Sequence, residues 1–333
     1  MVLPGTARDV AASPRTARGR ATRLPIRARQ FGTLIGLVAL SLVLWILTPH
    51  FLTVSNLLNV AEQTSINAVV AVGMTFVILS GGIDLSVGSI VALSGVVLGI
   101  ALRAEQPVWR ALPLALLIGA NCGLVNGLLI GFGSLPPFIV TLGTMSIARG
   151  VALMITEGRP VSGFEPSFRV LATGRIAFVP APVIAMAVVY LVAHFVLTRT
   201  TFGRYVYAIG GNEEATRLSG VAVRGQKMLI YAASGVTSAA AAIILTARLN
   251  SAQPIAGMMY ELDAIAATVI GGTSLMGGEG TLGGTLVGAL IMGVLRNGLN
   301  LLGVSSFLQQ VVIGAVIVVA VLLDTVLKRE HRA

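Results

Sequence analysis

The sequence is poor in charge and in the residues that build metal sites and disulfides. Only 11% of its 333 residues are charged and 55% are hydrophobic, whereas soluble domains carry about 25% charged residues. Its mean hydropathy is +0.90. The single cysteine, Cys122, excludes an intrachain disulfide, and the three histidines are scattered with no metal-ligand spacing. These shortages exclude an ordinary soluble domain and predict a polytopic membrane protein without a metal site.

Lysine is also scarce, and its positions exclude one class of ATPase. The only lysines are Lys227 and Lys328, and neither belongs to the Gly-x-x-x-x-Gly-Lys-Ser/Thr pattern of a phosphate-binding loop. The chain is therefore not a P-loop ATPase on its own, and we expect it to bind no cofactor itself. Carboxylates are also rare inside the apolar runs. Only Glu62 is placed deeper than a span end, which gives ion-driven transport little support.

The net charge of +10 is concentrated in three basic segments. They are the arm 1–30, which we expect to be disordered, the loop 199–227 and the tail 328–333. Basic segments stay on the cytoplasmic side of a membrane, so this distribution predicts cytoplasmic termini and needs no nucleic acid partner. The apolar run after the arm has no small-residue cleavage site, and we expect a retained span rather than a signal peptide.

Ten apolar runs follow one another, with lengths near the roughly 17–25 residues that a transmembrane helix needs. They fall at about 31–49, 57–79, 86–103, 111–132, 137–156, 179–198, 226–247, 262–276, 283–302 and 306–327. We therefore predict an all-α fold, a transmembrane helical bundle of about ten spans over residues 31–327 with Gly-rich broken segments. The eighth run is short, so a re-entrant half-helix is an alternative. The basic tail favours a full crossing, because a hairpin would move the C-terminus outside.

Several polar side chains fall inside these runs, where they are expected to face the protein interior or water. The candidates for lining a pathway, or for hydrogen bonds between helices, are Asn67, Asn121, Asn126, Asn297 and Asn300. Arg296 requires a carboxylate, carbonyl groups or water, unless it extends to a nearby interface. A stripe of glycines at every fourth residue, from Gly119 to Gly131, predicts close helix packing, with a seam beside a pathway as the alternative. The nearly charge-balanced loop 157–178 is a candidate docking surface on the outer side.

Two polar motifs interrupt the apolar pattern. The first, over 79–89, holds Gly81, Gly82, Asp84, Ser86 and Gly88. A polar break of this kind is expected at an interface, in a cavity or buried in protein, and one interpretation is a cytoplasmic turn in which Asp84 or Ser86 caps the next helix. The second motif, over 210–221, predicts a short cytoplasmic helix closed by a glycine. Its residues of interest are Glu213, Glu214, Ala215 and Gly220.

The first motif resembles the "GGIDLSVG" segment of the sugar permeases of ATP-binding cassette importers, in the ribose and simple-sugar branch. The motif over 210–221 is similar to the "EAA" loop that contacts the ATPase subunits of these importers, and two registers fit, 213–215 and 214–216. Further blocks at 251–254, 260–267, 271–275 and 297–304 most resemble the ribose-type permease. The resemblance covers about residues 35–327 and leaves out the arginine-rich arm.

This resemblance implies a permease subunit that carries a monosaccharide across the bacterial inner membrane and is not itself an enzyme. The implied partners are an ATPase subunit that binds ATP and Mg, a periplasmic or extracellular sugar-binding protein, a second permease copy and membrane lipid. One alternative is a stand-alone secondary carrier or channel for a small polar solute, which would work without an ATPase. Another is a membrane scaffold that transports nothing, in which polar residues inside the spans would matter only for stability.

Overall fold

The structure is a computed structural model that describes residues 26–330. Residues 1–25 of the predicted arm and 331–333 of the predicted tail lie outside the described residues. The helices are α1 (Ile26–Leu47), α2 (Val54–Leu79), α3 (Val87–Arg103), α4 (Val108–Gly131), α5 (Pro137–Thr156), α6 (Pro166–Thr173), α7 (Ala181–Arg199), α8 (Thr201–Gly211), α9 (Glu213–Leu218), α10 (Val223–Leu249), α11 (Tyr260–Ile270), α12 (Leu282–Leu301) and α13 (Ser306–Glu330). Short strands form two antiparallel pairs, β1 (Val161–Ser162) with β4 (Ser251–Ala252) and β2 (Arg175–Ile176) with β3 (Val179–Pro180).

The helices agree with an all-α membrane protein, although they are not ten full spans. Six of them, α2, α4, α5, α7, α10 and α12, are long and apolar enough to cross a membrane, and α1, α3 and α13 contain shorter apolar stretches. The helix α11 has 11 residues, or about 16 Å at 1.5 Å per residue. That is about half of the roughly 30 Å hydrocarbon core. The predicted full helical span over 262–276 is therefore wrong.

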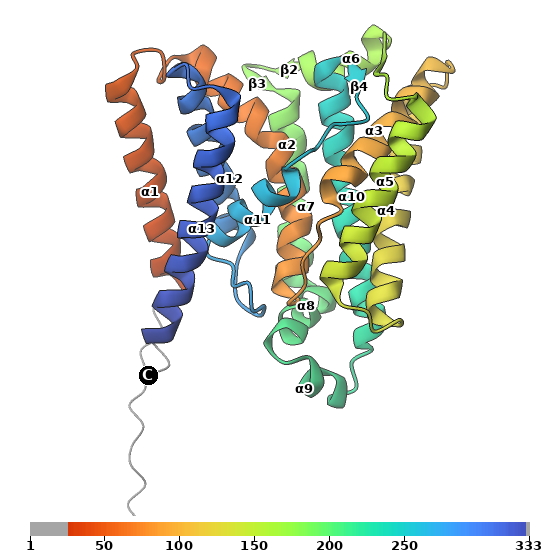
Figure 1. The fold of residues 1–333 in the computed structure, drawn as a ribbon, viewed down its shortest axis with the longest axis vertical. Coiled ribbons are helices and arrows are strands. Elements are labelled where there is room, and N and C mark those ends of the chain that lie inside the picture. Colours follow the sequence, from red (N-terminus) through yellow and green to blue (C-terminus); the bar gives the residue numbers. More distant parts are fainter. Residues whose placement is uncertain (1–25, 331–333) are drawn as a thin grey trace, which may run out of the picture.

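The segment containing α11 nevertheless runs from one end of the bundle to the other. It starts at β4, beside β1, and residues 253–259 descend as irregular chain to α11 in the middle of the bundle (Figure 1). The loop after α11 then reaches the end that carries α8 and α9, where the Gly278 amide donates to the Leu79 carbonyl at 2.8 Å. The segment therefore crosses the bundle as irregular chain followed by a half-length helix, and it is not a re-entrant hairpin.

A second broken crossing lies opposite the first. Helix α2 ends near α8, and residues 80–86 lead back into the bundle to the start of α3 (Figure 1). The two breaks touch at Gly88 and Gly257, because a Cβ on either glycine would overlap the carbonyl oxygen of the other. The first turn of α3 therefore packs against the chain that leads into α11.

The core is built around α2. Its residues 68–79 are all buried, because the helix packs against α7, α10, α11 and α12. A helix that is apolar on all sides is stable in this central position. The glycine stripe of α4 packs on α10, where a Cβ at Gly123 would overlap the backbone of Tyr231 and one at Gly119 would overlap that of Gly235. The stripe is thus a close-packing seam between two helices.

The two ends of the bundle carry different structures. The start of α1, the pair α8–α9 and the end of α13 lie at one end (Figure 1). The opposite end carries α6 and strands β1, β2 and β3, which come from residues 157–180, together with β4, which follows α10. Helix α1 begins at Ile26, inside the segment that was predicted to be a disordered arm.

Candidate functional site

The first motif places a carboxylate in the interior. Asp84 is fully buried. Its Oδ1 accepts from the Ser86 amide at 2.9 Å and from Ser86 Oγ at 2.5 Å, and its Oδ2 accepts from Ser234 Oγ of α10 at 2.7 Å. Three donors replace the water that a buried carboxylate would lose. Ser86 is the N-cap residue of α3, as one of the alternatives predicted, but its side chain makes no cap bond.

This network continues into two further helices. Asn126 of α4 donates from Nδ2 to Ser86 Oγ at 2.9 Å, and Thr144 of α5 donates to Asn126 Oδ1 at 2.5 Å. Asn126 is fully buried. The polar break of the first motif thus joins α4, α5 and α10 through one chain of hydrogen bonds. Gly82 lies beside it, where a Cβ would overlap the hydroxyl of Tyr231.

A second polar cluster surrounds Asp263 of α11, which is 3% exposed. Arg296 of α12 donates from Nη2 to both carboxylate oxygens, at 2.8 and 3.1 Å. Asn67 of α2 donates to Oδ2 at 3.1 Å. The partner of Arg296 is therefore a carboxylate, and the alternative that Arg296 extends to an interface is wrong. The pair holds the half-length helix α11 against α12 and α2.

The remaining predicted pathway residues are scattered. Asn297 exchanges two hydrogen bonds with Asn56, at 2.9 and 3.0 Å, which fastens α12 to α2. Asn300 accepts from Gln309 of α13 at 2.8 Å. Asn121 is exposed and donates to the Leu117 carbonyl of its own helix. The structure brings Asn67 and Asn126 into polar clusters and does not gather the five asparagines into one pathway.

The motif over 210–221 forms the predicted short helix. Asn212 caps α9 by accepting from the Ala215 amide at 2.9 Å. Glu214 pairs with Arg217 at 2.6 Å, and Glu213 pairs with Lys227 of α10 at 2.7 Å. The hydrogen bond from Arg217 lowers the pKa of Glu214. The helix therefore presents an exposed, ion-paired surface at the end of the bundle.

Gly220 follows α9 in the left-handed region, with φ +84°. No other atom lies within 4 Å of a Cβ built there. Glycine is therefore needed for its backbone conformation, which lets the chain turn from α9 into α10.

A glycine junction connects this surface to the first motif. We use this name for Gly210 of α8, Leu79 at the end of α2, and Gly277, Gly278 and Gly280 of the loop before α12. A Cβ at Gly210 would overlap the Leu79 carbonyl oxygen and the Gly278 amide nitrogen. Tyr207 of α8 also donates to the Gly280 carbonyl at 2.8 Å.

Backbone thus touches backbone at the glycine junction, where α8 contacts both broken crossings. The sequence contains all of these glycines. Their contact depends on segments about 70 and 130 residues apart, which local patterns do not reveal.

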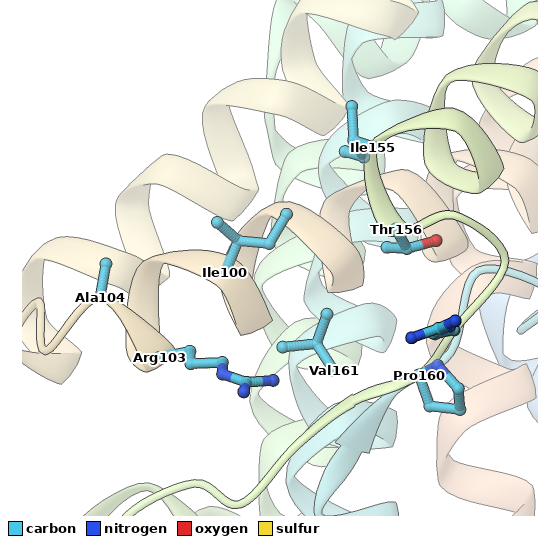
Figure 2. A pocket seen from close by; sticks show the side chains of 8 residues that line it. Ile100, Arg103, Ala104, Ile155, Thr156, Pro160 and Val161 are labelled. Atoms are coloured by element: carbon cyan, nitrogen blue, oxygen red, sulfur yellow. The ribbon is translucent and has the colours of Figure 1, made fainter.

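The opposite end of the molecule has a cleft of about 510 Å³. It lies between the last turns of α3 and α5 and the start of β1, and Arg103 extends into it (Figure 2). Arg159 also lines it. Neither arginine has an ion pair among residues 26–330. The predicted docking loop 157–178 therefore borders a positively charged hollow.

Comparisons with known proteins agree with the motifs. A family model described as branched-chain amino acid transport system / permease component matches residues 56–321. The ribose import permease protein of Haemophilus influenzae is 48% identical, over 92% of this chain and 95% of the relative. That of Bacillus subtilis is 51% identical, over 89% and 92%. The D-allose transport system permease protein of Escherichia coli is 39% identical, over 90% and 93%. No solved structure matches the chain.

Proposed function

This chain belongs to the permease family matched over residues 56–321, as the membrane-spanning subunit of an ATP-driven sugar importer, and we propose that its sugar is ribose. The identity to relatives carries this proposal. It is 48–51% to the ribose import permeases of Haemophilus influenzae and Bacillus subtilis, and 39% to permeases named for D-allose and L-arabinose. The choice among sugars is shared with an external binding protein, which we also propose as a partner.

The exposed helix α9 is the proposed contact for a separate ATPase subunit, which would bind ATP and Mg. Its acidic first turn, Glu213 and Glu214, and Ala215 face outward from the bundle end. Gly220 provides the turn behind it. Because α8 precedes α9 directly, a push on α9 reaches the glycine junction. Closure of the ATPase subunits around ATP can then favour one packing of the two broken crossings over another. Alternating access of the sugar pathway to the two sides of the membrane requires such a shift.

The orientation follows from charge. The start of α1, the pair α8–α9 and the end of α13 share one end of the bundle (Figure 1). Those segments adjoin the basic arm, loop and tail of the sequence, and basic segments remain cytoplasmic. We therefore place both termini in the cytoplasm of a bacterium, with α6 and the strands outside its inner membrane.

The binding protein would dock at the outer end. The cleft lined by Arg103 and Arg159 favours acidic side chains on that partner. A second permease copy would pack on an exposed side of the bundle. Helix α5 offers open space there, because no atom lies within 4 Å of a Cβ at Gly143 or Gly150. The remaining exposed apolar surface would contact lipid.

Competition for uptake tests the sugar. Vesicles holding the chain, its ATPase and its binding protein would import labelled ribose, and excess unlabelled sugar would be added. We expect unlabelled ribose to abolish the signal, and D-allose or L-arabinose to reduce it far less. Equal competition by all three, or uptake of another sugar in preference to ribose, would contradict the assignment.

A further inference from the structure

The irregular chain that leads into α11 exposes three apolar side chains. Ile255 is 55% exposed, Met258 63% and Met259 38%. Met259 has φ +70°, a left-handed conformation that only a few per cent of non-glycine residues adopt. Irregular backbone at membrane depth is tolerated only inside protein or beside a water-filled space. The exposure of Ile255, Met258 and Met259 therefore indicates a space beside them.

A guanidinium faces this segment from α5. Arg149 donates from Nη1 to the carbonyls of Pro254 and Ala256, at 2.8 and 2.6 Å. Its side chain is half-buried. Both bonds use one nitrogen, so Nε and Nη2 have no hydrogen-bond partner among residues 26–330. An arginine has five N–H donors in a planar fork. Arg149 thus anchors the segment and keeps donors for another molecule.

A carboxylate faces the same place from α11. Glu261, in its first turn, is half-buried and forms no ion pair among the residues that the structure describes. A Cβ at Gly88 would overlap Glu261 Oε2, so this oxygen lies against the first turn of α3. Glu261 and Arg149 border the same segment, because Arg149 binds the Pro254 and Ala256 carbonyls and Glu261 Oε2 lies beside the contact of Gly88 with Gly257. Charged groups at this depth face protein or water and mark functional sites.

We propose that Glu261 and Arg149 bind the hydroxyl groups of the sugar as it passes the meeting point of the two broken crossings, and that Met258 lines this passage. A carboxylate accepts, and a guanidinium donates, two parallel hydrogen bonds, which suits neighbouring hydroxyls of a neutral monosaccharide. The flexible thioether of Met258 packs against its apolar face. The two charges sum to zero, so the site does not favour an ion. This assignment rests on the proposed sugar transport.

Substitution of Glu261 separates a binding role from a structural one. Glu261→Gln keeps the shape and removes the charge. We expect ribose uptake to fall about tenfold, which corresponds to about 1.4 kcal/mol. ATP hydrolysis stimulated by the loaded binding protein should stay within about twofold of the unmodified importer. Glu62→Gln, a half-exposed carboxylate on α2, should change neither. Normal uptake by Glu261→Gln, or loss of assembly and hydrolysis together with uptake, would overturn the proposal.

Thiol labelling tests the passage itself. In a Cys122→Ala background the chain has no other cysteine, and a small hydrophilic thiol reagent reacts only where water admits it. Met258→Cys should be labelled in the assembled importer at least tenfold faster than Leu191→Cys on α7, a similarly exposed residue at 70%. Equal rates would overturn the passage at Met258. Uptake of ribose by the unmodified importer is measured in the same vesicles. If uptake is normal while the labelling rates are equal, the passage at Met258 is refuted and the proposed function is not.

Discussion

The free-energy cost of a substitution at the glycine junction can be estimated from individual contacts. In Gly210→Ala the new methyl group would overlap the Leu79 carbonyl oxygen and the Gly278 amide. Their mutual hydrogen bond of 2.8 Å contributes about 0.5–1.5 kcal/mol, and overpacking costs about 1–3 kcal/mol. The total is about 1.5–4.5 kcal/mol. At 1.4 kcal/mol per factor of ten, even 1.5 kcal/mol changes an equilibrium between two packings about twelvefold.

The assay compares sugar moved with ATP hydrolysed by the reconstituted importer. We expect Gly210→Ala to lower the ribose imported per ATP by tenfold or more, while hydrolysis stays within about twofold. The neighbouring Gly211 is a matched control, because no atom lies within 4 Å of a Cβ built there. Gly211→Ala should therefore behave as the unmodified chain. An unchanged ratio in Gly210→Ala, or equal losses in both variants, would show that the contacts of Gly210 do not couple α9 to the broken crossings.

Three further changes test the polar clusters and the coupling helix. Asp84→Asn replaces one acceptor oxygen with a donor, and we expect the free energy of unfolding to fall by roughly 1–3 kcal/mol; an unchanged Tm and uptake would remove Asp84 from the account. Asp263→Asn leaves Arg296 without its charged partner and should lower the free energy of unfolding by roughly 1–3 kcal/mol. The double variant Asp263→Asn, Arg296→Met should recover part of this loss. Equal Tm values for the unmodified chain and the two variants would contradict this expectation. Reversing both charges, with Glu213→Lys and Glu214→Lys, should leave the chain inserted but reduce coupled uptake, and normal ATP-driven uptake would remove α9 from the mechanism.

Local patterns in the sequence predicted most of the helices. The apolar runs agree with nine of the observed helices to within a few residues at most ends, because their length and composition are properties of a single segment. The short helix α9 was also predicted, since helix-forming residues and a closing glycine are local signals. The eighth run was misjudged, because its apolar residues continue past Ile270 into a loop that packs on α8.

Contacts between distant segments could not be predicted. The partner of Arg296 is 33 residues away on another helix, and Asp84 meets Ser234 across 150 residues. A polar residue in an apolar run indicates that a partner is needed, without saying which one it is. Arg149 and Glu261 were missed for a similar reason. Arg149 stands alone within an apolar run, and Glu261 is next to a predicted span end, so neither has a local pattern that links it to the other.

The requirement for an ATPase subunit distinguishes an ATP-driven importer from a carrier that works alone. The chain would be reconstituted in vesicles with the binding protein outside, either with or without the ATPase subunit, and with ATP inside. We predict ribose uptake only when ATP and both partners are present, together with hydrolysis stimulated by the loaded binding protein. Ribose uptake by the chain alone, without ATPase or ATP, would contradict this prediction and identify a secondary carrier or channel.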